Sequence, residues 1–154
     1  MLESPIMPHF GLMDEQSLGP EAGPLLRSRL HIRCGRRRLR QGKISLGIVT
    51  LYDAMVSALK WYVVSPERKE KLHIQYRESL NDDTVIYSIL RRSGKLDNSL
   101  DYDSFNALVE KALAQEIPDY DYTEFLKNFE SVMTQLGVMP FDENILPPED
   151  PSTV

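Results

Sequence analysis

The chain has 154 residues, of which 42% are hydrophobic and 27% are charged, and its formal net charge is −5 at pH 7. This length suits one domain with its own core, and the charged fraction is that of a globular protein rather than a disordered one. The single cysteine excludes an internal disulfide framework, and three scattered histidines argue against a zinc site. The negative net charge argues against nucleic-acid binding over the whole surface, although a local basic patch is compatible with it.

The start of the chain has none of the features of a targeting sequence. The first basic residue is Arg27, so the basic head of a secretory or mitochondrial leader is missing. Uninterrupted apolar runs are also far shorter than the roughly 18 residues that span a bilayer. We therefore expect a cytoplasmic, reduced protein that makes no membrane contact.

Proline divides the chain into three parts, because it removes a backbone hydrogen-bond donor and disfavours helix interiors. Four prolines lie at or before position 24, four lie after position 139, and only two fall between. We predict a flexible N-terminal segment over residues 1–23 and a helical domain over residues 24–137. Residues 138–154 form a proline-rich, acidic C-terminal strap or tail.

The first two predicted helices are adjacent in the sequence. Pro24 and Gly42 frame the first, although Gly35 lowers its helix propensity. The second has apolar residues at steps of three and four, which is typical of a buried helical stripe. Its stripe consists of Ile44, Ile48, Leu51, Met55, Ala58, Leu59 and Tyr62.

Further helices follow at shorter intervals. Ser65-Pro66 can end the second helix and start a third, on which Leu72 and Tyr76 form the apolar side. Asn81-Asp82 can cap a fourth helix that ends near Gly94. We expect Asp103 to cap a fifth, while Asp121 and Glu124 begin a sixth that ends before Gly137.

No segment shows the sustained alternation or the hairpin turns of β-structure. The predicted fold class is therefore all-α, a bundle of five or six helices with extended, proline-rich tails.

Charge is distributed unevenly along this chain. Residues 25–43 hold eight basic side chains and no acid, whereas no basic residue follows Lys127. Arg33, Arg36, Arg37 and Arg40 recur at helical spacing, so one helix face would gather them for phosphate or nucleic-acid binding. The alternative, which we favour, is that these arginines pair with the protein's own surplus of acids or face water, since a basic start and an acidic finish attract each other.

Cys34 lies in the same arginine-rich segment. Nearby cations could make it a reactive thiol, but a partly buried structural thiol is the preferred interpretation.

The C-terminal segment is too apolar to be a plain solvated linker. It carries Phe141, Ile145 and Leu146 between prolines and acids. Such a segment can cross its own bundle as a strap, which we favour, or dock on a partner in extended form.

One stretch of the sequence is similar to a known family. From Arg38 to Trp61, a glycine is followed by an aromatic-x-Ala-Met-x-x-Ala core, formed by Gly42, Tyr52, Ala54-Met55 and Ala58. This stretch resembles the first helical hairpin of the HEPN superfamily of nucleotide-binding four-helix bundles. The resemblance implies a helical bundle, usually dimeric, that acts as a ribonuclease, as a nucleotidyltransferase partner or as a non-catalytic binding module.

Catalytic members of that superfamily carry an arginine and, four to six residues later, a histidine near the last core helix. Arg68 and His73 have this spacing but lie much earlier in the chain, and His73 is the last histidine. A solvated helix face is the preferred interpretation, so we do not expect ribonuclease activity.

The sequence therefore predicts a non-catalytic helical interaction or regulatory module that requires no cofactor or metal. We expect it to form a homodimer or similar homo-oligomer and to bind a protein partner. The alternative is a HEPN-like module that binds a nucleotide or RNA through the four arginines.

Overall fold

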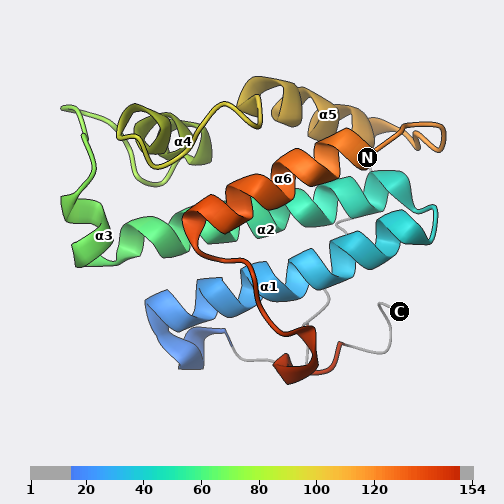
Figure 1. Ribbon diagram of the computed structural model, residues 1–154, viewed down its shortest axis with the longest axis horizontal. Helices are drawn as coiled ribbons and strands as arrows, with labels where there is room; N and C mark the ends of the chain where they lie inside the picture. The colour runs from blue at the N-terminus through green and yellow to red at the C-terminus, as the bar shows by residue number, and fades with distance from the viewer. Residues whose placement is uncertain (1–14, 150–154) are drawn as a thin grey trace.

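The computed structural model describes residues 15–149, which contain six α-helices and no β-strand (Figure 1). The prediction of an all-α fold is confirmed; most of the predicted N-terminal segment, residues 1–14, lies outside the described residues. The α-helices are α1 (Gly19–Arg40), α2 (Ile44–Val64), α3 (Pro66–Glu70), α4 (Asp83–Arg92), α5 (Tyr102–Ala114) and α6 (Thr123–Leu136). Two short 3₁₀-helices flank them, η1 (Gln16–Leu18) and η2 (Glu143–Ile145).

Helices α1 and α2 form a long hairpin in which the two backbones approach closely. A Cβ atom added at Gly35 would lie 2.6 Å from Leu51 Cδ2, and one at Gly47 would lie 2.8 Å from Leu39 Cδ2. Each glycine therefore makes room for a leucine of the facing helix. This packing explains why Gly35 stands inside α1 although glycine lowers helix propensity. Gly42 ends the first helix with a φ of 81°, a conformation that favours glycine.

Helix α2 is the central element of the core. Every member of its predicted apolar stripe is buried except Tyr62, which is half-buried. By length and composition this helix could also cross a membrane, but 67% of the relevant window is buried inside the protein. Such burial is what the core helix of a bundle shows, so the feature is weak evidence for a membrane span.

The helices α4, α5 and α6 complete the core against α2. Phe105 on α5 packs against two aromatic side chains of α6, with ring centroids 5.4 Å from Phe125 and 6.3 Å from Phe129. Asp82 caps α4, as the sequence predicts, by accepting hydrogen bonds from the backbone of Thr84 and Val85. Helix α6 ends at Gly137 in a left-handed conformation, which is also the predicted end.

Four helix boundaries differ from the predicted ones: the starts of α1, α5 and α6, and the end of the third predicted helix. Helix α6 begins at Thr123 after Tyr122, and Asp121 accepts a hydrogen bond from the backbone of Thr123. Helix α1 begins at Gly19, because Pro20 rather than Pro24 occupies its first turn, so the predicted boundary at residue 24 falls inside the helix. The cap of α5 is Asp101, which accepts from the backbone of Asp103 and Ser104. The predicted cap, Asp103, lies in the first turn instead.

The third predicted helix is much shorter than expected. Helix α3 ends at Glu70, so Leu72 and Tyr76 do not share a helix face. Leu72 is buried, whereas Tyr76 is 88% exposed in the loop that leads to α4. Two apolar positions at helical spacing are too few to predict a helix that reaches Tyr76, because a short helix is stable only when its apolar face packs against the protein.

Candidate functional site

The chain after α6 crosses the outer face of α1, so two predicted features form one surface. We call residues 138–149 the strap; they lie across α1 on the side away from α5 (Figure 1). Arg29 Nε donates a hydrogen bond to the carbonyl oxygen of Val138 at 3.0 Å, and Arg33 Nη2 donates to that of Pro147 at 2.6 Å. The arginines of α1 therefore fix both ends of the strap.

The carboxylates of the strap and of α6 neutralise three of the four predicted arginines. Glu149 forms ion pairs with Arg33, at 3.3 Å from Nε, and with Arg37. Arg36 lies between two acids, Glu130 of α6 at 2.7 Å and Glu143 of the strap. These ion pairs occupy the guanidinium N–H groups that would otherwise donate hydrogen bonds to a phosphate.

Arg40, the fourth predicted arginine, is different. It lies at the C-terminal end of α1, is exposed and makes no ion pair within residues 15–149. The four arginines thus share one helix, but only three of them share the surface under the strap.

The acids set the electrostatics of this surface. Burial is the largest single influence on Arg36 and lowers its pKa, but the hydrogen bonds to Glu130 and Glu143 outweigh it and raise the pKa overall.

Cys34 is fully buried, and this burial raises the pKa of its thiol despite the neighbouring arginines. The thiol is therefore protonated near neutral pH and is not an activated nucleophile.

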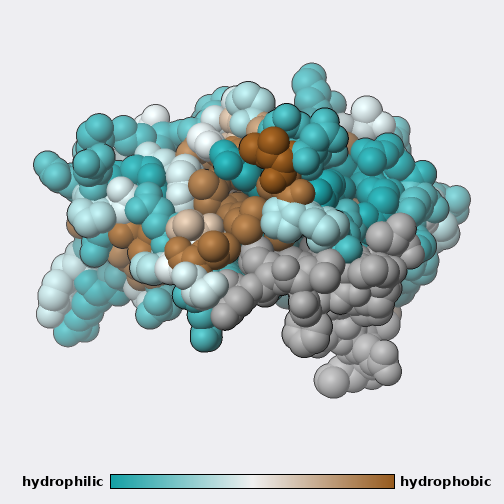
Figure 2. Space-filling view, turned by 90° about the horizontal axis from the view of Figure 1, so that it is seen from below, coloured by the Kyte–Doolittle hydropathy of each residue, from teal (hydrophilic) through white to brown (hydrophobic). Residues whose placement is uncertain are grey.

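The three apolar residues predicted for the tail lie in three different environments on the strap. Phe141 is half-buried, with the guanidinium carbons of Arg29 and Arg36 at 5.6 and 5.9 Å from its ring centroid. Leu146 is half-buried, and Ile145 is 78% exposed. Figure 2, which views this side of the molecule, shows apolar surface gathered in the middle of the face. Of the three predicted apolar residues of the strap, Ile145 is the one whose side chain is largely exposed.

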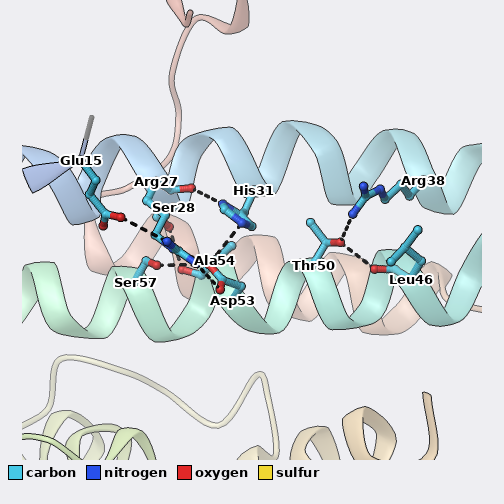
Figure 3. A network of polar contacts seen from close by, with 10 residues as sticks. All are labelled: Glu15, Arg27, Ser28, His31, Arg38, Leu46, Thr50, Asp53, Ala54 and Ser57. Carbon is cyan, nitrogen blue, oxygen red and sulfur yellow. Dashed lines mark hydrogen bonds and ion pairs between the residues drawn. The ribbon is translucent and has the colours of Figure 1, made fainter. Parts of the chain in front are cut away.

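The inner face of α1 carries a second polar network, which sequence reasoning missed (Figure 3). Arg27 donates two hydrogen bonds of 2.8 Å to the carboxylate of Asp53 on α2, and these bonds raise the pKa of its guanidinium. His31 is fully buried, with Nε2 at 3.4 Å from the same carboxylate. Farther along the helix, the buried Arg38 donates to Thr50 at 2.7 Å. These groups lie between two packed helices, which indicates a structural role.

The proposed catalytic candidates of the sequence, Arg68 and His73, have separate contacts. Arg68 donates to the carbonyl oxygens of Tyr62 and Trp61, and its guanidinium lies over the Trp61 ring, 4.0 Å from the centroid. The backbone of His73 is bound to Ser93 and Arg92 at the start of the α3–α4 loop. Arg68 therefore holds the C-terminal end of α2, and the structure gives no contact that joins the pair.

Residues 15–149 contain no group of three or more histidine, cysteine or carboxylate side chains able to hold a metal ion.

The sequence carries one signal for the surface under the strap, which is its uneven distribution of charge. The sequence shows a basic start and an acidic finish, and Arg29 and Glu130 belong to the surface that these two regions build.

Comparison of the chain with family models, with curated proteins and with solved structures gives no match. The HEPN resemblance therefore depends on the residues quoted for it. Ala54, Met55 and Ala58 are fully buried core positions of α2, and Gly42 forms the turn before that helix. Core packing alone would select these residue types.

Proposed function

We propose that this protein is a non-catalytic helical interaction module that docks a protein partner on the strap and the adjacent surface of α1. The observation that carries the proposal is the position of Ile145, which is 78% exposed on a segment held by ion pairs at Glu143 and Glu149. An apolar side chain fixed in an exposed position loses little conformational freedom when a partner covers it, and such preorganisation favours binding.

Surrounding residues support the same proposal. Met139, Phe141 and Leu146 are half-buried on the strap, and Leu26 occupies the same stripe of α1 as Arg29 and Arg33 at helical spacing. Apolar surface of this kind, rimmed by charged groups, is typical of protein interaction sites.

The alternative, binding of a nucleotide or RNA through Arg33, Arg36, Arg37 and Arg40, has less support. A phosphate that entered this surface would have to displace Glu143 and Glu149 from three of these guanidinium groups. Of these four arginines, Arg40 alone forms no ion pair within the described residues.

The experiment places a photo-crosslinking amino acid at position 145 in the full chain and, as a matched control, at Leu113. Leu113 is 42% exposed on α5, away from the strap. A partner captured at position 145 is then purified and titrated against the wild-type protein and an Ile145→Ser variant. We expect Ile145→Ser to weaken binding about tenfold, while Leu113→Ser leaves it unchanged.

The same protein is titrated with labelled single-stranded RNA at low and high ionic strength, with fluorescence anisotropy as the readout. We expect no saturable binding. Saturable binding that weakens steeply with salt and is lost in Arg33→Glu/Arg37→Glu would favour the nucleic-acid alternative, and equal crosslinking at positions 145 and 113 would overturn the proposed docking surface.

A further inference from the structure

A groove lies between α5 and α6, on a part of the molecule that the strap does not reach. Its volume is about 410 Å³, and its apolar lining consists of Leu100, Phe105, Leu108, Tyr120 and Phe125. The groove is therefore large enough to take an aromatic side chain and offers it apolar contacts.

The rim of the groove is acidic. Asp101, Asp121 and Glu124 lie on it, and no basic residue lines it. Hydrogen bonds from Ser104 lower the pKa of Asp101, and those from Thr123 lower the pKa of Asp121, so both stay ionised at any physiological pH. Residues 96–126 contain eight acids and a single base, Lys111, while Lys95, Lys127 and Arg91, whose charge also lowers the pKa of Asp101, lie outside the lining of the groove. An occupant of this groove should therefore combine an apolar tip with positive charge.

The loop between α3 and α4 offers an apolar tip beside positive charge. Tyr76 is 88% exposed and Ile74 is 37% exposed. Arg77 follows Tyr76 directly and Lys71 begins the loop, and both are exposed. The acid beside them, Glu78, is already paired with Arg92 at 2.5 Å.

The same loop is held in a defined conformation. The backbone of His73 donates to Ser93 Oγ at 2.8 Å, and Arg92 donates to the carbonyl oxygen of His73 at 3.0 Å. Arg77 has a φ of 68°, which is rare for a side chain other than glycine, and its guanidinium carbon lies 5.3 Å from the Tyr76 ring centroid. Tyr76 is therefore presented to solvent rather than left to fold back.

We propose that the protein self-associates by placing the Tyr76 loop of one copy in the α5–α6 groove of a second copy. Tyr76 and Ile74 meet the apolar lining, while the bases of the loop face Asp121 and Glu124. Within one molecule the loop lies beyond the end of α2 and the groove opens between α5 and α6, so a single copy cannot make this contact (Figure 1). The proposal is independent of the strap and of its partner.

The contact is small, which sets its expected strength. A buried tyrosine contributes about 150–250 Å² of contact area, whereas a standard interface buries about 800 Å² on each partner. Two reciprocal contacts would close a two-fold dimer, and a single contact per pair would give open chains. We expect a reversible association that weakens as ionic strength rises.

The test is sedimentation velocity of the full chain over a wide concentration range, at low and at high ionic strength. We expect wild-type protein to associate in a concentration-dependent manner. Tyr76→Ala and Glu124→Lys should each raise the dissociation constant about tenfold or more. The matched controls Leu113→Ala and Glu110→Lys, which change exposed residues of α5 outside the groove, should leave it unchanged.

A mixture of the two variants gives the sharpest result. The Tyr76→Ala copy keeps an intact groove and the Glu124→Lys copy keeps an intact loop, so the mixture should associate more tightly than either variant alone. Circular dichroism of each variant checks folding, and Tyr76 is too exposed for its loss to unfold the protein. A wild-type protein that stays monomeric throughout, a mixture that does not associate, or an association that only Ile145→Ser reduces would overturn the proposal.

Discussion

The two faces of α1 both carry arginines paired with carboxylates, but the partners come from different places. On the inner face, Arg27 pairs with Asp53, which α2 supplies from the other side of the same hairpin. On the outer face, Arg33 and Arg37 pair with Glu149, more than a hundred residues later in the chain. The inner pair joins the two helices of the hairpin, whereas the outer pairs join α1 to the strap. The same chemistry thus stabilises the core in one place and a surface segment in the other.

The substitution with the largest expected effect is Asp53→Asn, on the inner face of α1. The change keeps the size of the side chain but removes the charge that Arg27 and His31 face. Both side chains of the Arg27–Asp53 pair are about one quarter exposed, so we expect a loss of about 2–3 kcal/mol in the free energy of unfolding. Urea denaturation of the two proteins measures it.

Glu15→Gln is the matched control. Glu15 accepts one hydrogen bond of 3.1 Å from Arg27, against the two of 2.8 Å that Asp53 accepts, so its loss should lower the free energy of unfolding by less than about 1 kcal/mol. Equal effects of the two substitutions would contradict the view that the two-bond contact with Asp53 is the stronger one.

A second test uses pH and a buried hydroxyl of the core. Burial raises the pKa of Tyr87 to about 12 from a usual value near 10. Below pH 10 both folded and unfolded states keep this proton, so it has no effect on stability there. Between pH 10 and 12 the unfolded state loses the proton first, so stability should fall by up to about 1.4 kcal/mol per pH unit from this residue.

Tyr87→Phe should remove the part of the fall in unfolding free energy above pH 10 that Tyr87 causes. Denaturation at a series of pH values from 9 to about 11.5 compares the variant with the wild type. Parallel slopes for the two proteins would show that Tyr87 ionises as easily in the folded protein as in the unfolded one.

The third test concerns the outer face. Glu149→Gln removes the carboxylate shared by Arg33 and Arg37, and its side chain is only 9% exposed. Release of the strap returns Arg33 and Arg37 to water and so limits the penalty of leaving them unpaired. We therefore expect a loss of about 1 kcal/mol in strap attachment, while global unfolding changes little. Hydrogen exchange of strap amides, or the rate of limited proteolysis after α6, measures this local opening.

The smallest expected effect is that of Glu143→Gln. Glu143 is 43% exposed, and Glu130 still neutralises Arg36 when it is lost. We expect a change of about 0.5 kcal/mol or less in strap attachment. If Glu143→Gln released the strap more than Glu149→Gln, the assignment of Glu149 as the main anchor would be wrong.

Much of the fold could be predicted from the sequence, because helix formation depends on local spacing and on local caps. The stripe on α2 predicted which side chains are buried, and Asp82 and Gly137 predicted where two helices begin and end. The boundary errors have local causes too. Two aspartates two residues apart compete to cap α5, and two prolines four residues apart compete for the first turn of α1.

The surface under the strap could be predicted only in part. Helical spacing identified Arg33, Arg36 and Arg37 as neighbours, and the uneven charge distribution indicated that acids of the same chain were available as partners. Which acids pair with which arginines depends on the path of the strap, and no local rule determines that path. Gly35 is similar, since its role appears only when Leu51 of the facing helix is in place.

By itself, the sequence determined the fold class, the buried stripe of α2 and the presence of a basic helix face beside an acidic, apolar tail. These properties follow from periodicity, capping and composition, which act over a few residues. Only the tertiary structure decided that the tail neutralises that face, that Arg68 stacks on Trp61, and that an acidic groove and the Tyr76 side chain remain exposed. Each of these depends on contacts between residues distant in the chain, whose geometry is set by how the helices pack.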